Sequence, residues 1–115
     1  MLKVIIAGSR TFRNYEYLSK ELDIRIPPFI DEVISGDAEG PDKMGARWAE
    51  EHGYSVKHFP AQWNKYGKAA SIIRNHEMGD YADYLIAFWD GKSRGTKDMI
   101  DYMRSIGKHG EVILC

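Results

Sequence analysis

The first group of residues suited to chemistry follows the opening apolar run of the chain and comprises Gly8, Ser9 and Arg10. Glycine lets backbone N–H groups approach a ligand closely, and the serine hydroxyl and the guanidinium can donate to phosphate or carboxylate oxygens. A plain turn carrying a solvated arginine explains the same residues equally well. The group is not the dinucleotide-binding fingerprint, because no second and third glycine follow at the required spacing.

The second group is a glycine-flanked turn that opens a helix, with Gly36 and Gly40 around the turn and Asp42 in the first helical turn. A helix amino terminus favours anions and hydroxyl partners. Asp37, Glu39 and Asp42 would repel a phosphate, so we expect a sugar hydroxyl or a base at this place. The alternative is that Asp42 only stabilises the positive end of its helix.

The third group combines an aromatic ring with cations and an amide: Trp63, Lys68, Arg74 and Asn75. A tryptophan in a polar loop offers a face for stacking, and nearby cations offer contacts to phosphate. Trp63 equally fits a loop anchor packed on the core. Arg74 follows two isoleucines on a predicted helix, which argues against a purely solvated arginine.

The fourth group lies between a predicted strand and a predicted helix and contains Trp89, Gly91, Gly95 and Thr96. Two glycines that bracket a loop leading into a helix amino terminus are typical of a phosphate cradle. The loop lacks the Gly-Lys-Thr ending of a P-loop, which argues against an ATPase. We expect an anion or a ribose here rather than a plain turn.

Strand and helix patterns alternate along the whole chain and position these groups. Apolar runs typical of a parallel sheet predict strands over residues 2–7, 32–35, 54–59, 84–88 and 111–114. Helical spacing predicts three helices with these core-facing residues: Tyr15, Leu18, Leu22 and Ile26; Met44, Gly45, Trp48, Ala49 and His52; and Met99, Ile100, Met103 and Ile106. A further helix with a weaker apolar stripe is predicted over residues 67–78.

This alternation predicts an α/β fold, a Rossmann-like three-layer sandwich with a five-stranded parallel sheet of strand order 3-2-1-4-5. Ligands of such sheets bind outside the carboxyl ends of the strands, where neighbouring crossovers leave to opposite faces. All four polar groups fall at that edge. The sequence therefore predicts one binding site there.

Composition narrows the class of protein. The 115 residues suit one domain over residues 1–115, and 43% hydrophobic with 29% charged residues is ordinary globular composition. The net charge of −1 disfavours nucleic acid as a partner. A single cysteine, Cys115, and the lack of a long apolar segment indicate a cytoplasmic protein without a membrane span. The four histidines lack metal-ligand spacing, so we expect neither a metal nor a cofactor.

Four blocks of the sequence together are similar to a known family. The segments IIAGSRTF, SGDAEGPD, FPAQW followed by YGKAA and RN, and ADYLIAFWDGKSRGT resemble, in order, the YspA/YpsA-like branch of the SLOG superfamily. The resemblance implies a Rossmann-like fold that binds a nucleotide or an NAD-derived small molecule. It also implies kinship with Lonely Guy phosphoribohydrolases and Smf/DprA proteins, and with small members frequent in phage and prophage genomes.

The resemblance places the family's pocket motifs on Gly8, Ser9, Arg10, Gly36, Gly40, Asp42, Trp63, Gly67, Lys68, Arg74, Asn75, Gly91, Gly95 and Thr96. The sequence departs from the family pattern at three places. Asp37 and Glu39 replace a glycine and a basic residue, and Ser71 replaces a glycine. Met99 stands where Lonely Guy enzymes carry a glutamate; Asp98 comes one position early and is turned away by about 100° on a helix.

Two functions remain open from the sequence. The first is a module that binds a nucleotide- or NAD-derived small molecule as a sensor, or sequesters a nucleotide immune signal in a phage setting. The alternative is a phosphoribohydrolase that cleaves an N-glycosidic bond, with Asp42 and Arg74 as its candidate catalytic residues. Met99 disfavours the hydrolase, and the charge balance disfavours a DprA-like nucleic-acid partner. A homo-oligomer is left open.

Overall fold

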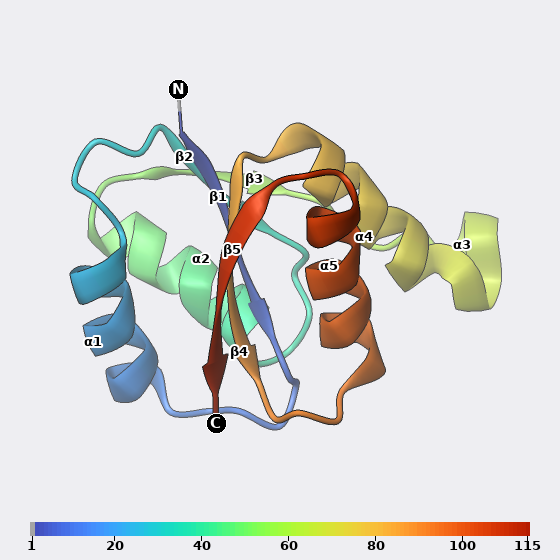
Figure 1. Cartoon of the computed structure of the whole chain (residues 1–115), viewed down its shortest axis with the longest axis horizontal. Coiled ribbons are helices and arrows are strands. Elements are labelled where there is room, and N and C mark those ends of the chain that lie inside the picture. Colours follow the sequence, from blue (N-terminus) through green and yellow to red (C-terminus); the bar gives the residue numbers. More distant parts are fainter. Residues whose placement is uncertain (1) are drawn as a thin grey trace.

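A computed structural model describes residues 2–115 and contains one parallel sheet of strand order β3-β2-β1-β4-β5 (Figure 1). Every neighbouring pair of strands is parallel. The predicted fold class and strand order are therefore confirmed. The strands are β1 (Lys3–Gly8), β2 (Glu32–Ser35), β3 (Ser55–His58), β4 (Tyr84–Trp89) and β5 (His109–Leu114).

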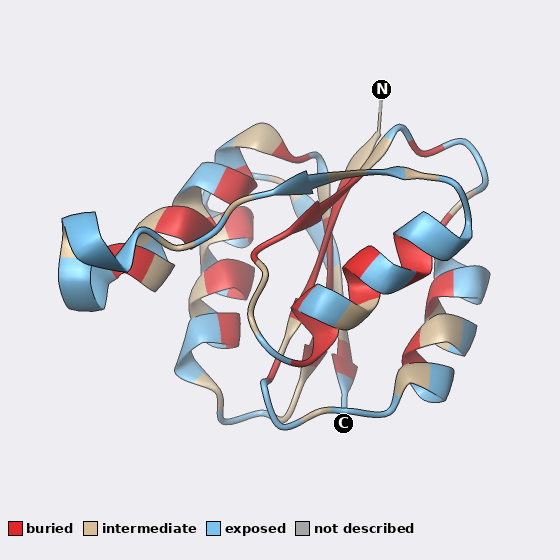
Figure 2. Cartoon of the chain, turned by 180° about the vertical axis from the view of Figure 1, so that it is seen from behind, coloured by how far each residue is buried: buried red, intermediate tan, exposed pale blue. Residues whose placement is uncertain are grey.

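Helices cover both faces of the sheet and make three layers, as Figures 1 and 2 show. They are α1 (Tyr15–Arg25), α2 (Pro41–Glu51), α3 (Trp63–Tyr66), the 3-10 turn η1 (Gly67–Ala69), α4 (Ala70–Tyr81) and α5 (Arg94–Ser105). The helices α1 and α2 pack on one face, and α4 and α5 pack on the other. The short helix α3 projects from the amino end of α4, away from the sheet (Figure 1).

The central strand β1 supplies both cores because alternate residues of a strand point to opposite faces. Val4 and Ile6 belong to the buried cluster under α1 and α2, which also contains Trp48. Ile5 and Ala7 belong to the buried cluster under α4 and α5. Burial on both faces explains why the strand reads as a continuous apolar run rather than an alternating one.

Local signals set the starts of two helices. The Asn14 side chain accepts a hydrogen bond from the Tyr17 amide at 3.1 Å and caps α1. Pro41 occupies the first turn of α2, where its missing N–H costs nothing. Gly40, directly before it, has a φ of 85°, a conformation that favours glycine.

Several predicted boundaries were wrong, and glycine turns account for most of the differences. Trp63 lies in a short helix instead of a loop, and the positive φ of Gly67 separates that helix from α4. The predicted core residues His52 and Ile106 lie just past the ends of α2 and α5 and are exposed. Both helices stop there because the glycine that follows each of them turns the chain with a positive φ.

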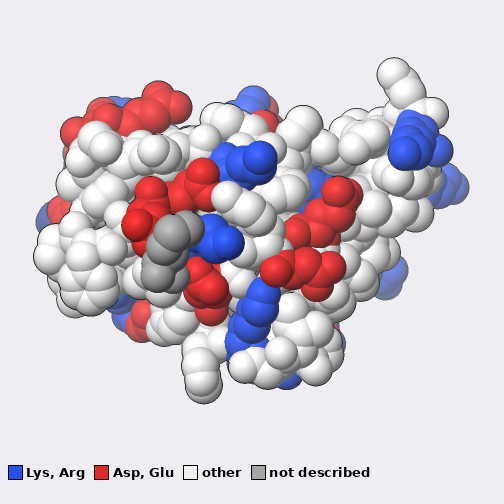
Figure 3. All heavy atoms as spheres, turned by 90° about the horizontal axis from the view of Figure 1, so that it is seen from above, with Lys and Arg blue, Asp and Glu red and all other residues white. Residues whose placement is uncertain are grey.

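The edge at the amino ends of the strands carries mixed charge. Figure 3 looks down on this edge and shows acidic and basic side chains side by side. Arg25, in the last turn of α1, pairs with Glu21 at 2.9 Å and with Glu111 of β5 at 2.6 Å. Within residues 2–115, the helices are all too short or too polar to cross a membrane.

Candidate functional site

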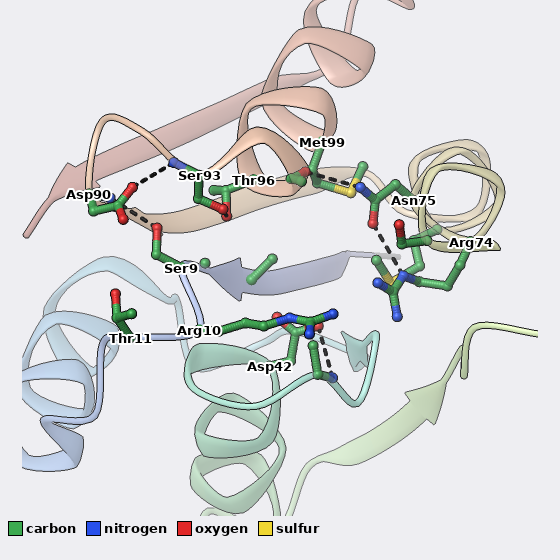
Figure 4. Close-up of a pocket in the computed structure, with 16 residues that line it drawn as sticks. Ser9, Arg10, Thr11, Asp42, Arg74, Asn75, Asp90, Ser93, Thr96 and Met99 are labelled. Carbon is green, nitrogen blue, oxygen red and sulfur yellow. Dashed lines mark hydrogen bonds between the residues drawn. The ribbon is translucent and has the colours of Figure 1, made fainter. Parts of the chain in front are cut away.

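A pocket of about 370 Å³ opens at the carboxyl ends of β1 and β4, the lower edge of the sheet in Figure 1. This is the place where the crossover after β1 leaves to one face and the crossover after β4 leaves to the other. We call it the main pocket (Figure 4). It brings together eight of the predicted site residues: Gly8, Ser9, Arg10, Asp42, Arg74, Asn75, Gly95 and Thr96.

A smaller hollow of about 180 Å³ adjoins the main pocket, and we call it the side hollow. Arg10, Ala38 and Arg74 line both spaces, so these residues form the boundary that the two spaces share. Two further predicted residues, Gly36 and Trp63, line the side hollow only. The site is therefore wider than a single pocket.

Arg74 reaches the site from α4 and is only 8% exposed. Its Nε donates to Asn75 Oδ1 at 3.2 Å, and its Nη1 donates to the carbonyl oxygen of Gly36. Burial lowers the pKa of Arg74, Asp42 raises it, and the like charge of Arg10 lowers it further. A Cβ at Gly36 would lie 2.9 Å from Nη1, so glycine at that position leaves the space that the guanidinium occupies.

Arg10 approaches the same space from the end of β1. In Figure 4 its side chain extends across Asp42 toward Arg74. The backbone around it is held by Ser9, whose amide donates to the Phe88 carbonyl oxygen at 2.9 Å. Within residues 2–115, neither Arg10 nor Arg74 forms an ion pair with a carboxylate.

Asp42 is a carboxylate buried in the floor of the main pocket, with an exposed fraction of 5%. Its Oδ2 accepts a long hydrogen bond from the Ala38 amide at 3.4 Å. Burial raises the pKa of Asp42 to about 6, because it disfavours the charged form more than the attraction of Arg74 favours it. Asp42 can therefore hold or release a proton near neutral pH.

The loop between β4 and α5 is ordered by Asp90. Asp90 Oδ1 accepts from the amides of Lys92 at 2.8 Å and Ser93 at 2.7 Å, and these bonds lower the pKa of Asp90. Ser9 Oγ accepts from the Asp90 amide at 3.0 Å and ties the loop to β1. The hydroxyls of Ser93 and Thr96 lie 3.2 Å apart at the start of α5. The amino terminus of α5 and these hydroxyls thus face the main pocket (Figure 4).

Asn75 joins α4 to α5. Its Nδ2 donates to the Gly95 carbonyl oxygen at 3.1 Å and to Asp98 Oδ2 at 3.2 Å. Asp98 also lies 3.4 Å from His76 Nε2. Met99, and not Asp98, lines the main pocket. Asn75 therefore acts on the site mainly by holding the amino end of α5 in place.

Five other predicted site residues line neither space, and one of them is Gly67, which separates α3 from α4. Gly40 shapes the turn into α2, and a Cβ there would lie 3.0 Å from the Ser9 carbonyl oxygen. Lys68 is exposed on η1, and Gly91 forms a turn with a φ of 81°. The Trp89 indole is committed to the loop, because its Nε1 donates to the Ser93 carbonyl oxygen at 3.0 Å.

Other lining residues were not among the predicted site residues. Ser71 and Met78 fall three residues before and four residues after Arg74, so helical spacing from Arg74 was the signal that could have found them. The full set is Ala7, Thr11, Ala38, Ser71, Met78, Asp90, Ser93 and Met99. Among residues 2–115, no three His, Cys, Asp or Glu side chains are grouped as metal ligands would be.

Comparisons with known proteins agree with this architecture. The model of the YspA, cpYpsA-related SLOG family matches residues 2–66 of the chain. The chain is also similar to Gene 61 protein of Mycobacterium phage D29, with 35% identity over 107 residues that cover 84% of each chain. No solved structure matches it. The chain therefore belongs to the YspA, cpYpsA-related SLOG family.

Proposed function

We propose that this chain binds a small phosphate-bearing molecule derived from a nucleotide in the main pocket. The observation that carries the proposal is the pair of guanidiniums of Arg10 and Arg74, which face one space and have no carboxylate paired with them within residues 2–115. Their like charges oppose each other, and an anion placed between them would relieve that repulsion. Phosphate oxygens match the planar fork of a guanidinium.

The remaining groups suit the other parts of such a ligand. The hydroxyls of Ser9 and Thr96 and the amino terminus of α5 can donate to an anion or a ribose. Asp42 can accept from a sugar hydroxyl, or donate to the ligand when it holds its proton. The volume of about 370 Å³ lies in the range of small-molecule pockets.

Family membership supports a nucleotide-related ligand. We propose that the chain acts as a sensor or as a sequestering module, holding the ligand rather than converting it. The similarity to a phage protein supports the sequestering role, in which the chain would bind a nucleotide signal of the infected cell. Met99 supports binding over cleavage, because it lines the pocket where related hydrolases carry a glutamate.

Calorimetry with AMP and ribose 5-phosphate tests the proposed pocket. Arg10→Ala and Arg74→Ala should each weaken binding by about 1.5–3 kcal/mol, because each removes charge-assisted hydrogen bonds. Arg104→Ala is the matched control, since Arg104 is exposed at the far end of α5 and lines neither space. Unchanged affinity in both pocket variants would refute the proposed site.

Asp42 favours one second candidate, hydrolysis of an N-glycosidic bond. A buried carboxyl group with a pKa of about 6 suits a general acid or base near neutral pH, and Asp42 lines the pocket together with Arg74. The test is incubation with AMP followed by chromatography for released adenine. Turnover that disappears in Asp42→Asn would establish the hydrolase, whereas binding without release of base supports the binding module.

A further inference from the structure

The side hollow differs from the main pocket because an aromatic residue lines it. Trp63 lines this hollow from α3 and is 52% exposed. The other two indoles already form hydrogen bonds within the protein: Trp48 Nε1 donates to Asp23 Oδ1 at 3.0 Å, and Trp89 Nε1 donates to the Ser93 carbonyl oxygen. The Trp63 indole has no hydrogen bond and no aromatic partner among residues 2–115. Its face is free for a planar ligand group.

The two arginines lie at the boundary between the side hollow and the main pocket. Arg10 and Arg74 line both spaces, so an anion bound between them has the main pocket on one side and Trp63 on the other. A ligand that fills both spaces therefore carries its phosphates in its middle. The main pocket offers hydroxyls, backbone amides and the Asp42 carboxyl, which suit a sugar. The side hollow offers an aromatic face, which suits a base.

Asp37 adds a polar contact to the side hollow. It lines the hollow, and its Oδ1 is held by His58 Nδ1 at 2.7 Å and by the Ser35 hydroxyl at 3.4 Å. No hydrogen bond to Oδ2 is formed within residues 2–115. That oxygen can accept from an exocyclic amino group of a base, which would orient the base while its ring stacks on Trp63.

We infer that the side hollow is a second subsite, in which Trp63 stacks on the aromatic base of a ligand whose phosphates bridge Arg10 and Arg74 and whose far end occupies the main pocket. This inference rests on the proposed function, since it takes the two arginines as the phosphate site. It assigns the ligand to the class of phosphate-bridged molecules with a base at one end and a sugar-type group at the other. Such a ligand is larger than a mononucleotide.

The test compares a probe that has no base with a larger probe that carries one. Ribose 5-phosphate carries only the sugar and phosphate, whereas ADP-ribose carries a base, two phosphates and a second sugar. Trp63→Ala should weaken ADP-ribose binding about tenfold, as expected for one lost base–aromatic stack, and leave ribose 5-phosphate binding unchanged. Trp63→Phe should retain most of the ADP-ribose affinity. It should also lose the change in tryptophan fluorescence that ADP-ribose produces in the unaltered protein.

Controls separate failure of this inference from failure of the proposed function. Phe29→Ala truncates another exposed aromatic residue, which lines neither space, and should change neither affinity. If Trp63→Ala leaves ADP-ribose binding unchanged while Arg10→Ala weakens it, the second subsite is wrong and the phosphate site stands. Equal losses for both probes in Trp63→Ala would also overturn the subsite. If neither probe binds, or if neither arginine variant weakens binding, the proposed function fails and the subsite with it.

Discussion

Two ionisable side chains of the candidate site, Asp42 and Arg74, are buried. Asp42 is a buried carboxyl group with a long hydrogen bond, and Arg74 is a buried guanidinium that uses a backbone carbonyl oxygen as a partner. Burial disfavours the charge on each of them, so it raises the pKa of Asp42 and lowers that of Arg74. Perturbed groups gathered in one pocket are typical of functional sites.

The raised pKa of Asp42 makes a prediction about stability. Between the ordinary pKa of an aspartic acid and about 6, the folded protein keeps a proton that the unfolded chain has released, so stability falls as pH rises through this window. Asp42→Asn removes this loss. From about pH 4 to pH 7, the free energy of unfolding of the variant should rise by about 2 kcal/mol relative to that of the unaltered protein.

Urea unfolding across this pH range measures the difference. Glu50→Gln is the control, because it removes an exposed carboxylate from the same helix, α2. A gap between Asp42→Asn and the unaltered protein that stays constant with pH would show that folding does not raise the pKa of Asp42.

At the scale of elements, the site depends on how closely α2 packs on β1. Gly45 faces Ile6 across this contact, and a Cβ at Gly45 would lie 2.5 Å from Ile6 Cγ2. A glycine here lets the helix approach the central strand. The same helix carries Asp42 near its start, and the end of the same strand leads into Ser9 and Arg10. The spacing between these two elements therefore sets the distance between two walls of the main pocket.

Gly45→Ala should lower the free energy of unfolding by about 1–3 kcal/mol, because the added methyl group overpacks this contact. Gly95→Ala is the matched control at the start of α5, where a Cβ would meet no atom within 4 Å. That variant should be more stable by about 0.4–1 kcal/mol, since alanine restricts the unfolded chain. Urea unfolding of both variants checks the contrast. Equal stabilities would contradict the close packing of α2 on β1.

At the scale of the whole molecule, the two arginines of the candidate site differ from the charged residues at the opposite edge of the sheet. The net charge is −1, and the edge opposite the site pairs its acidic and basic side chains (Figure 3). The site edge instead holds two arginines without ion pairs among residues 2–115. Asp42 and Asp90 line the same pocket, so a small anion would bind to the two guanidiniums themselves and not to a broad basic surface such as nucleic acid requires.

Ligand binding should stabilise the whole fold, because residues of β1, α2, α4 and α5 line the site and these elements meet only in the folded chain. At a ligand concentration 100-fold above Kd, linkage adds about 2.7 kcal/mol. For a domain of this size the expected rise in Tm is about 10 °C. Thermal unfolding with and without ADP-ribose measures it. Arg104→Ala should keep the shift and Arg10→Ala should lose most of it at the same concentration; an equal shift in both would contradict binding at the arginines.

The sequence by itself determined the fold and the edge of the sheet where the site lies. Local sequence features predict the strands and the starts of helices. A continuous apolar run such as Val4–Ala7 predicts a buried strand, and Asn14 and Pro41 each predict the start of a helix. The right-handed crossover then leaves few strand orders for five alternating units. Glycine-containing loops after β1, β2 and β4 therefore had to meet at the carboxyl edge.

Only the tertiary structure decided how each side chain takes part. Arg74 donates a hydrogen bond to the carbonyl oxygen of Gly36, which lies 38 residues away in the sequence. A pattern of neighbouring residues cannot predict a contact over this separation. Trp63 equally fitted a core anchor or a stacking face, and its position on the short helix α3 leaves it exposed beside Arg10 and Arg74. Lys68 carries the same charge as these arginines but points into solvent. The burial of a side chain and its contacts depend on elements that are distant in the chain. The local sequence determines only the secondary-structure propensity of a segment and the periodicity of its apolar residues.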